Sequence, residues 1–218
     1  LILQKTDEAI ANQIGGLGDL LKNNGGTSTL SGAADFANVN VTSGTLAITS
    51  ALSANVSTTV AAGATLNATG ATTLQLGALT LGGALTGAPN ATAGNTTIAS
   101  TGAYTGTGKS LTVTGTLDVA ASGALTVGSF STTGALTSAG AVTSAGAVSA
   151  ASVGITGGTF AAGALTSTGA FTNAGATTLT GGLTAASVTQ AAGSLSAASL
   201  STAGALTING GSATFAGN

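Results

Sequence analysis

The sequence predicts an all-β fold, a parallel β-solenoid preceded by one short amphipathic α-helix. Three near-identical hexads follow one another at residues 134–151, and they read GALTSA, GAVTSA and GAVSAA. Leu136, Val142 and Val148 are the only large side chains in them, while Gly and β-branched Thr recur too often for a stable helix. Looser copies of the unit fill most of the chain after Thr27, and internal repetition of this kind is typical of solenoids.

Residues 1–26 differ from the rest because they hold Lys5, Asp7, Glu8, Asp19 and Lys22, five of the eight charged residues. Thr6 is predicted to cap a helix that ends at the Asn-Asn-Gly-Gly run of residues 23–26. One apolar stripe of this helix has spacings of four, three and four: Ile10, Ile14, Leu17 and Leu21. The helix would be marginal alone, so we expect its stripe to cap the repeat domain or to pack on a neighbouring subunit.

The β-solenoid repeat domain is predicted to comprise residues 27–218. Its first part shows apolar pairs with a period of two, such as Leu79 and Leu81, which are typical of short strands with one buried face. Residues 87–95 contain the only proline and are expected to form a loop or a wide corner.

Large apolar residues recur mostly every five to seven positions from residue 98 onward. We expect each of them to point into the solenoid, where its burial contributes ~1.5–3 kcal/mol. Phe171 is expected to be one of these inward residues, and Ser167 is expected at an outward corner.

The composition argues against several functional classes. Only 4% of the residues are charged, 3% are aromatic, and His and Cys are absent. Catalytic triads that use His or Cys, the common zinc sites and disulfides are therefore excluded. After Asp35 the only charged residues are Lys109 and Asp118, so the repeats cannot supply a carboxylate pair for glycoside hydrolysis. We expect a non-enzymatic protein without a cofactor or metal, and the net charge of −2 argues against a nucleic-acid partner.

Two further patterns are weak. Residues 102–110 resemble a phosphate-binding loop, but the first glycine comes one residue too late and no helix pattern follows, so Lys109 is interpreted as a solvated turn residue. Rows such as Thr112, Thr114 and Thr116 are typical of flat ice-binding faces, but the sequence shows no Thr at a fixed phase in every repeat.

Three features bear on the location of the protein. Asn-x-Ser/Thr motifs at Asn40, Asn55, Asn67, Asn90 and Asn95 are acceptor sites for glycosylation, and about as many arise by chance in a chain so rich in Ser and Thr. The longest apolar run, at residues 74–85, is too short to span a bilayer. The chain begins at Leu1 rather than Met, which fits either the removal of an export leader or a trimmed terminus.

Several phrases resemble known repeat families. Residues 122–127, 163–175 and 203–211 (SGALTV, GALTSTGAFTNAG and AGALTINGG) resemble the repeats of filamentous-haemagglutinin-type adhesins and autotransporter passengers. Residues 70–87 and 175–185 resemble repeats of phage tail-fibre shafts. The first resemblance implies a right-handed parallel β-helix on a bacterial surface.

We therefore expect a structural subunit of an extracellular or cell-surface filament that assembles by head-to-tail stacking. The expected contacts are the Ile10, Ile14, Leu17 and Leu21 stripe at one end and Phe215 at the other. The expected partners are copies of the same chain and a surface polysaccharide or host glycan. One alternative is a trimeric phage tail-fibre or spike shaft in a virion, and another is a monomeric adhesin stalk that binds glycans through residues 87–110.

Overall fold

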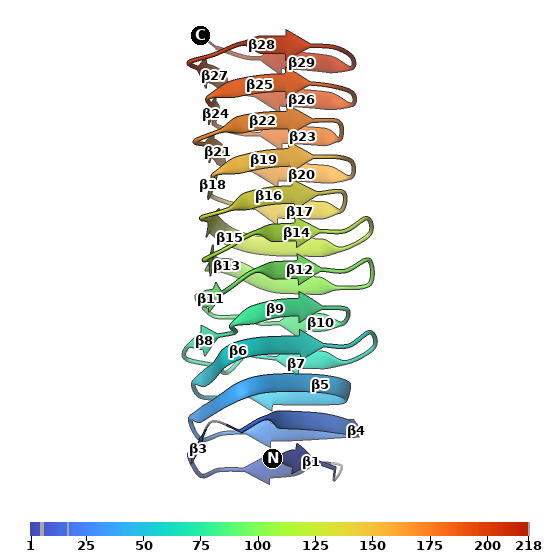
Figure 1. Cartoon of the computed structure of the whole chain (residues 1–218), viewed down its shortest axis with the longest axis vertical. Coiled ribbons are helices and arrows are strands. Elements are labelled where there is room, and N and C mark those ends of the chain that lie inside the picture. Colours follow the sequence, from blue (N-terminus) through green and yellow to red (C-terminus); the bar gives the residue numbers. More distant parts are fainter. Residues whose placement is uncertain (5–6, 17, 218) are drawn as a thin grey trace.

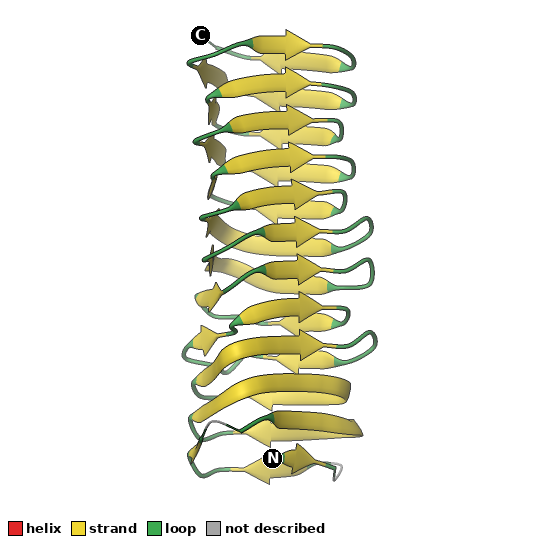
Figure 2. Cartoon of the chain, viewed as in Figure 1, coloured by secondary structure: helices red, strands yellow, loops and turns green. Residues whose placement is uncertain are grey.

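The computed structural model describes residues 1–4, 7–16 and 18–217. These residues form a parallel β-solenoid of about 12 turns, which rises along one long axis from the N-terminal to the C-terminal coil (Figure 1). All the strand pairs are parallel, and each strand between the first and last coils pairs with strands of the coils above and below, so backbone donors and acceptors are satisfied between coils. Figure 2 shows strands joined by short loops, and none of the described residues is helical.

Three parallel sheets form the sides of the solenoid, and we call them front, rear and side. The longest strands turn a corner and contribute to two or three sheets.

The front sheet contains β1 (Ile2–Leu3), the first part of β4 (Leu20–Leu30), the middle of β5 (Ala34–Ile48), the second part of β6 (Leu52–Val60), β9 (Ala78–Leu81), β12 (Thr96–Ile98), β14 (Leu117–Val119), β16 (Ala135–Ser138), β19 (Ser152–Ile155), β22 (Ala170–Asn173), β25 (Ser187–Gln190) and β28 (Leu206–Ile208). The rear sheet contains β2 (Glu8–Ile10), the ends of β4 and β5, β7 (Thr65–Asn67), β10 (Ala84–Thr86), the first parts of β13 (Ala103–Val113) and β15 (Ala124–Thr132), β17 (Ala141–Ser144), β20 (Thr159–Ala162), β23 (Ala176–Leu179), β26 (Ser194–Ala197) and β29 (Ser212–Phe215). The side sheet contains β3 (Ile14–Gly15), the first parts of β5 and β6, β8 (Leu74–Gln75), β11 (Ala91–Ala93), the ends of β13 and β15, β18 (Ala147–Ala150), β21 (Ala164–Ser167), β24 (Gly182–Ala185) and β27 (Ser199–Thr202).

The three hexads that carry the repeat signal form one turn of the solenoid. Each hexad supplies one strand, namely β16, β17 and β18, and the small residues after each strand form the corner. Leu136, Val142 and Val148 all point inward and are at most 1% exposed. One aliphatic residue per side therefore fills the interior, as the sequence predicted.

Apolar side chains of successive coils stack into ladders along the interior. Phe171, for example, lies in register between Val153 and Val188, and its side chain is 0% exposed. Corresponding residues of neighbouring coils are 17 to 22 positions apart, so the coils differ in length mainly at their corners. Burial of these ladders, at ~25 cal/mol per Å² of apolar surface, is the main force that holds the coils together.

Glycine is required at several corners because backbones of adjacent coils approach closely there. Gly158 has φ +63°, and a Cβ at this position would lie 2.1 Å from the carbonyl oxygen of Gly140. Gly193 has φ +68° and would bring a Cβ equally close to the carbonyl oxygen of Gly175. Only glycine adopts this conformation readily and leaves room for the neighbouring coil.

The predicted N-terminal helix is wrong. Ile10 lies in β2 of the rear sheet, Ile14 in β3 of the side sheet and Leu21 in β4 of the front sheet, so the residues belong to three sides of the first two coils rather than to one stripe. Leu17 and the proposed cap Thr6 lie outside the described residues. Three glycines at positions 15, 16 and 18 weaken a helix, and parallel pairing with β4 and β5 provides the stronger alternative. Strand β4 also runs across the boundary expected between residues 26 and 27.

Two smaller expectations also need correction. Ser167 is 3% exposed, and its Oγ donates to the carbonyl oxygens of Ala151 (3.4 Å) and Ala170 (3.4 Å), so it is not at an outward corner. The loop expected at residues 87–95 is shorter, since Ala91–Ala93 already forms β11. Phe171, in contrast, is buried as predicted.

Ser167 belongs to a set of polar residues that occupy the last inward position of a strand and bind the following corner. Asn173 Nδ2 donates to the Gly175 carbonyl oxygen at 3.2 Å, and Gln190 Nε2 donates to that of Ala192 at 2.5 Å. Ser144 Oγ donates to the Gly146 carbonyl oxygen at 3.3 Å in the same way. These side chains therefore find acceptors at the corner carbonyls, and those of Gly146 and Gly175 also accept a backbone N–H of the next coil.

Tyr104 is the largest fully buried side chain, and its hydroxyl has no hydrogen-bond partner among the described residues. It lies between Leu85 and Leu125 of the adjacent coils. An unpaired buried hydroxyl destabilises a fold by ~1–3 kcal/mol, so Tyr104→Phe is expected to raise the free energy of unfolding by about 1 kcal/mol or more. Urea unfolding of the wild type and of Tyr104→Phe at neutral pH measures the difference in the free energy of unfolding. A variant that is less stable than the wild type would contradict the prediction.

The same substitution should change the response to alkali. Burial raises the pKa of Tyr104 above its ordinary value of 10.0, so above pH 10 the unfolded chain releases this proton more readily than the folded chain, and stability falls. Burial lowers the pKa of Lys22 from 10.5, which makes stability rise with pH up to that value. Because Lys22 contributes equally to both proteins, the extra stability of Tyr104→Phe should grow between about pH 8 and about pH 11.

Candidate functional site

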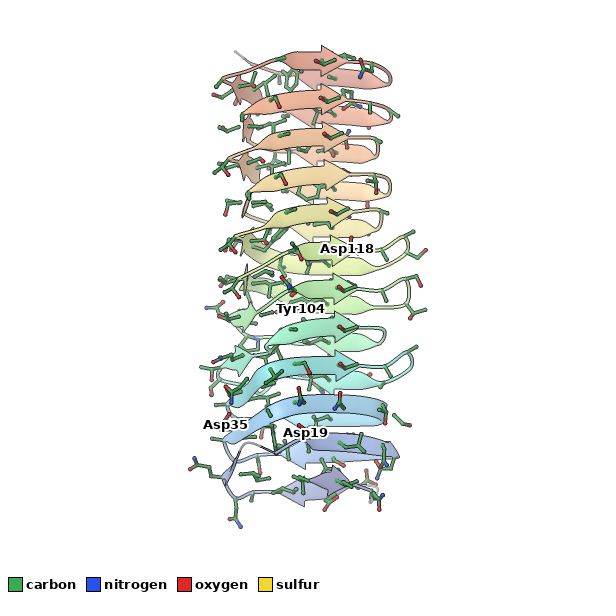
Figure 3. All side chains as sticks on the ribbon, in the orientation of Figure 1. Asp19, Asp35, Tyr104 and Asp118 are labelled. Carbon is green, nitrogen blue, oxygen red and sulfur yellow. The ribbon has the colours of Figure 1, made fainter. Side chains whose placement is uncertain are left out.

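Most charged residues lie in the N-terminal part of the chain, and only Lys109 and Asp118 follow Asp35. Asp19 and Asp35 lie in the N-terminal third, and Asp118 lies on the front sheet several coils further on (Figure 3). Within the part of the chain that the structure describes, no three acidic residues come close enough to hold a metal ion. Lys109 is exposed at a register shift inside β13, so residues 102–110 do not join a strand to a helix.

An open groove of about 590 Å³ lies across the side sheet, near the N-terminal end. It runs along the long axis from β3 through β5, β6 and β8 to β11. The outward residues of these strands follow one another in register: Asp35, Ser53, Gln75 and Thr92. We call this set the groove row.

Apolar groups lie beside the groove row. Leu52 and Leu74 lie beneath the groove with their side chains buried in the coil interior, whereas Ile14 and Ala51 are half-buried and line the wall. The groove therefore combines a partly exposed aliphatic wall with polar atoms that repeat at the distance between neighbouring strands, ~4.8 Å.

Hydrogen bonds hold part of the groove row in place. Asn55 Nδ2 donates to Asp35 Oδ1 at 2.7 Å, and Ser53 Oγ donates to Asn55 Oδ1 at 3.2 Å. Asn90, at the far end of the groove, accepts a hydrogen bond from the Ser110 backbone N–H at 3.0 Å. Gln75 and Thr92 are exposed, and their side chains have no hydrogen-bond partner among the described residues.

A second hollow of about 340 Å³ adjoins the first, since Gln75 and Thr92 line both of them. Val56 lies in this second hollow with 61% of its surface exposed, more than any other large hydrophobic side chain described. Gly77 and Gly94 form its other side. The two hollows are thus joined at Gln75 and Thr92, and the second adds the exposed apolar side chain of Val56.

Above the groove, the same outward position of the side sheet carries only hydroxyl residues. They follow one another in register from coil to coil: Thr92, Thr112, Ser131, Ser149, Thr166, Thr184 and Ser201. Ser replaces Thr at three of these positions, so this is a row of hydroxyl groups rather than of Thr in every coil, and its intervals vary between 17 and 20 residues. Thr114 and Thr116, which had suggested a face with Thr112, lie outside the strands.

Asn90 and Asn95 of the glycosylation motifs lie at corners, Asn55 and Asn67 lie in β6 and β7, and all four use their amides in hydrogen bonds. Asn55 is bound to Asp35 as described, Asn67 Oδ1 accepts from the Thr69 N–H at 3.1 Å, and Asn95 Oδ1 accepts from the Thr116 N–H at 3.0 Å. Asn40 lies within β5 and is half-buried. Glycosylation at these positions stays a prediction.

The residues expected at an assembly interface lie at the two ends of the solenoid. Ile10 and Ile14 are half-buried in the first coil, and Phe215 is half-buried in the last. Leu21 lies in the second coil, in register with Ile2 and Asn40, and is also half-buried. Leu17 lies outside the described residues.

Of residues 87–110, which were expected to bind glycans in a monomeric stalk, only Asn90 and Thr92 line the main groove. Nothing in their spacing along the sequence indicated that residues 13–75 would complete this groove.

No membrane-spanning helix occurs in the described parts of the chain. Comparison of the chain with protein-family models, with curated proteins and with solved structures finds no match in any of the three.

Proposed function

We propose that this chain is a non-enzymatic structural subunit of an extracellular or cell-surface filament, and that copies of it stack head to tail. The observation that carries the proposal is the exposure of interior-type side chains in the last coil. Leu206 and Ile208 occupy inward positions of β28, yet they are 42% and 53% exposed, whereas their register partners Val188 and Gln190 are 0% exposed. A further coil placed on β28 would bury them.

The first coil of another copy fits this position because it presents the same three sheets. In such a stack, Leu200 of the side sheet would approach Ile14, Ile208 of the front sheet would approach Leu3, and Phe215 of the rear sheet would approach Ile10. Both surfaces are apolar at these positions, and each also carries unpaired strand edges that favour the addition of a strand. A contact between two different ends does not close on itself, so it generates filaments.

Location outside the cell is part of the proposal and is supported by the resemblance of the repeats to secreted β-helical adhesins. The same resemblance supports a surface polysaccharide or host glycan as a partner. A trimeric tail-fibre or spike shaft and a monomeric adhesin stalk are the competing assemblies, and imaging distinguishes them from a filament.

Substitution at the last coil tests the stacking. Phe215→Lys places a charge in the contact and is expected to abolish long polymers in negative-stain micrographs and in sedimentation velocity, while wild type forms them. Thr214→Lys is the matched control, because Thr214 is exposed and points outward from the same strand. Short trimeric rods or monodisperse particles from the wild-type chain would contradict the proposal, as would normal filaments from Phe215→Lys.

A further inference from the structure

Most of the groove on the side sheet lies away from the head-to-tail contact, because only Ile14 at its N-terminal end would also face the next copy, so the chemistry of its other residues can be considered separately. It is formed by five successive strands of the side sheet. The coil interior beneath the groove is already closely packed, because the side chains of Leu52 and Leu74 are only 1% and 3% exposed. The exposed Gln75 and Thr92 side chains, which lack protein partners, therefore have no evident role in the packing of the coil.

Several ligand classes do not fit this groove. A peptide cannot add to the side sheet here as an extra strand, since β5, β6, β8 and β11 pair with one another through the groove. An anionic ligand would meet the carboxylate of Asp35, and no Lys lines the groove. A fully apolar ligand would leave the amide of Gln75 and the carboxylate of Asp35 desolvated without partners.

The remaining match is a neutral molecule that has many hydroxyl groups and also an aliphatic face. The groove row offers acceptors on Asp35 and donors and acceptors on Gln75 and Thr92, over three strand intervals or about 14 Å. Ile14, Ala51 and Val56 offer partly exposed aliphatic surface beside this row. Sugar rings present hydroxyl groups at their edges and C–H groups on their faces, so they complement both parts of the groove.

We propose that this groove binds a neutral oligosaccharide that lies along the long axis of the solenoid. Its hydroxyl groups hydrogen-bond to Asp35, Gln75 and Thr92, and its ring faces rest on Ala51 and Val56. Asn55 holds the Asp35 carboxylate in position through the 2.7 Å hydrogen bond. Binding needs only one chain, so this inference does not rest on filament formation, and either proposal can fail without the other.

Calorimetric titration of the 218-residue chain with separate neutral oligosaccharides tests the inference. The probes are maltoheptaose, cellohexaose, laminarihexaose and mannohexaose, and a heparin oligosaccharide serves as the anionic comparison. We expect at least one neutral probe to bind with one site per chain and the heparin oligosaccharide not to bind. Gln75→Ala is expected to weaken the binding about tenfold, because the side chain supplies one or two hydrogen bonds.

Two further variants make the result specific to the groove. Ser53→Trp fills the middle of the groove with a bulky ring and is expected to abolish binding. Thr166→Ala removes a hydroxyl from the same outward position beyond the groove and is expected to leave the affinity unchanged. Circular dichroism of each variant verifies the fold. The inference is overturned if no neutral probe binds, if heparin binds instead, or if Gln75→Ala and Ser53→Trp bind as tightly as wild type.

Discussion

Replacing Phe171 with Asp is expected to lower the free energy of unfolding by at least about 5 kcal/mol. The side chain is 0% exposed between Val153 and Val188, so the substitution removes a large apolar residue and buries a carboxylate without a partner. Solenoid coils contact only their neighbours, so the damage should be greatest in the adjacent coils. Chemical denaturation measures the loss, and hydrogen exchange locates it.

Thr172→Asp is the matched control for this experiment. Thr172 is the next residue of β22, it points outward and it is exposed, so its substitution is expected to change stability by less than about 0.5 kcal/mol. Ser167 would be an unsuitable control, because its side chain is buried. Unfolding of Phe171→Asp and Thr172→Asp at the same denaturant concentration would show that the inward phase of β22 is wrong.

The second large effect is expected at a buried polar network between two coils. Asn173 Nδ2 donates to Gln190 Oε1 at 3.0 Å and to the Ser194 carbonyl oxygen at 2.9 Å, and Asn173 Oδ1 accepts from Thr177 Oγ1 at 2.8 Å. Asn173, Thr177 and Gln190 are at most 1% exposed. Asn173→Leu leaves several of these atoms unpaired and is expected to destabilise the fold by about 3 kcal/mol.

The double variant Asn173→Leu with Gln190→Leu should lose less free energy of unfolding than the sum of the losses of the two single variants. The positions in register above and below the pair are Ile208 and Ile155, so the ladder already accepts aliphatic residues. Removal of both partners avoids one unpaired amide, and we expect a coupling of about 1–2 kcal/mol in a double-mutant cycle. Additive effects would contradict a direct interaction. Thr172→Ala with Thr189→Ala, on the outer side of the same strands, should be additive.

The repeat architecture could be predicted because it depends on short-range patterns. One aliphatic residue in each hexad, followed by small residues, determines both the strand and the corner, as in Leu136, Val142 and Val148. The N-terminal segment could not be predicted in this way, since Ile10 and Ile14 have a spacing that suits a helix as well as two strands separated by a corner. Pairing with β4 and β5, which is distant in the sequence, decides between them.

The buried polar residues and the groove could not be predicted from the sequence either, and the reason is related. A pattern that only separates apolar from polar residues places Asn173 and Gln190 on the surface. Their side chains instead point inward, where their amides donate hydrogen bonds to corner carbonyls. The groove combines Asp35, Gln75 and Thr92 only because coils of unequal length place them in register. A single sequence gives the spacing along the chain but not this alignment between coils.

The direction of the backbone hydrogen bonds has a mechanical consequence. They join strands of successive coils, which are stacked along the long axis (Figure 1), so a pulling force on the two ends is carried by all the coil interfaces in series. The bonds of one interface share the load, and when it yields, one coil peels away. Val153 and its partner Phe171 are 18 residues apart, so each such event would release roughly 60 Å of extended chain. Under tension the molecule would therefore lengthen in a sawtooth series of steps and dissipate work at each one, while remaining stiff against bending.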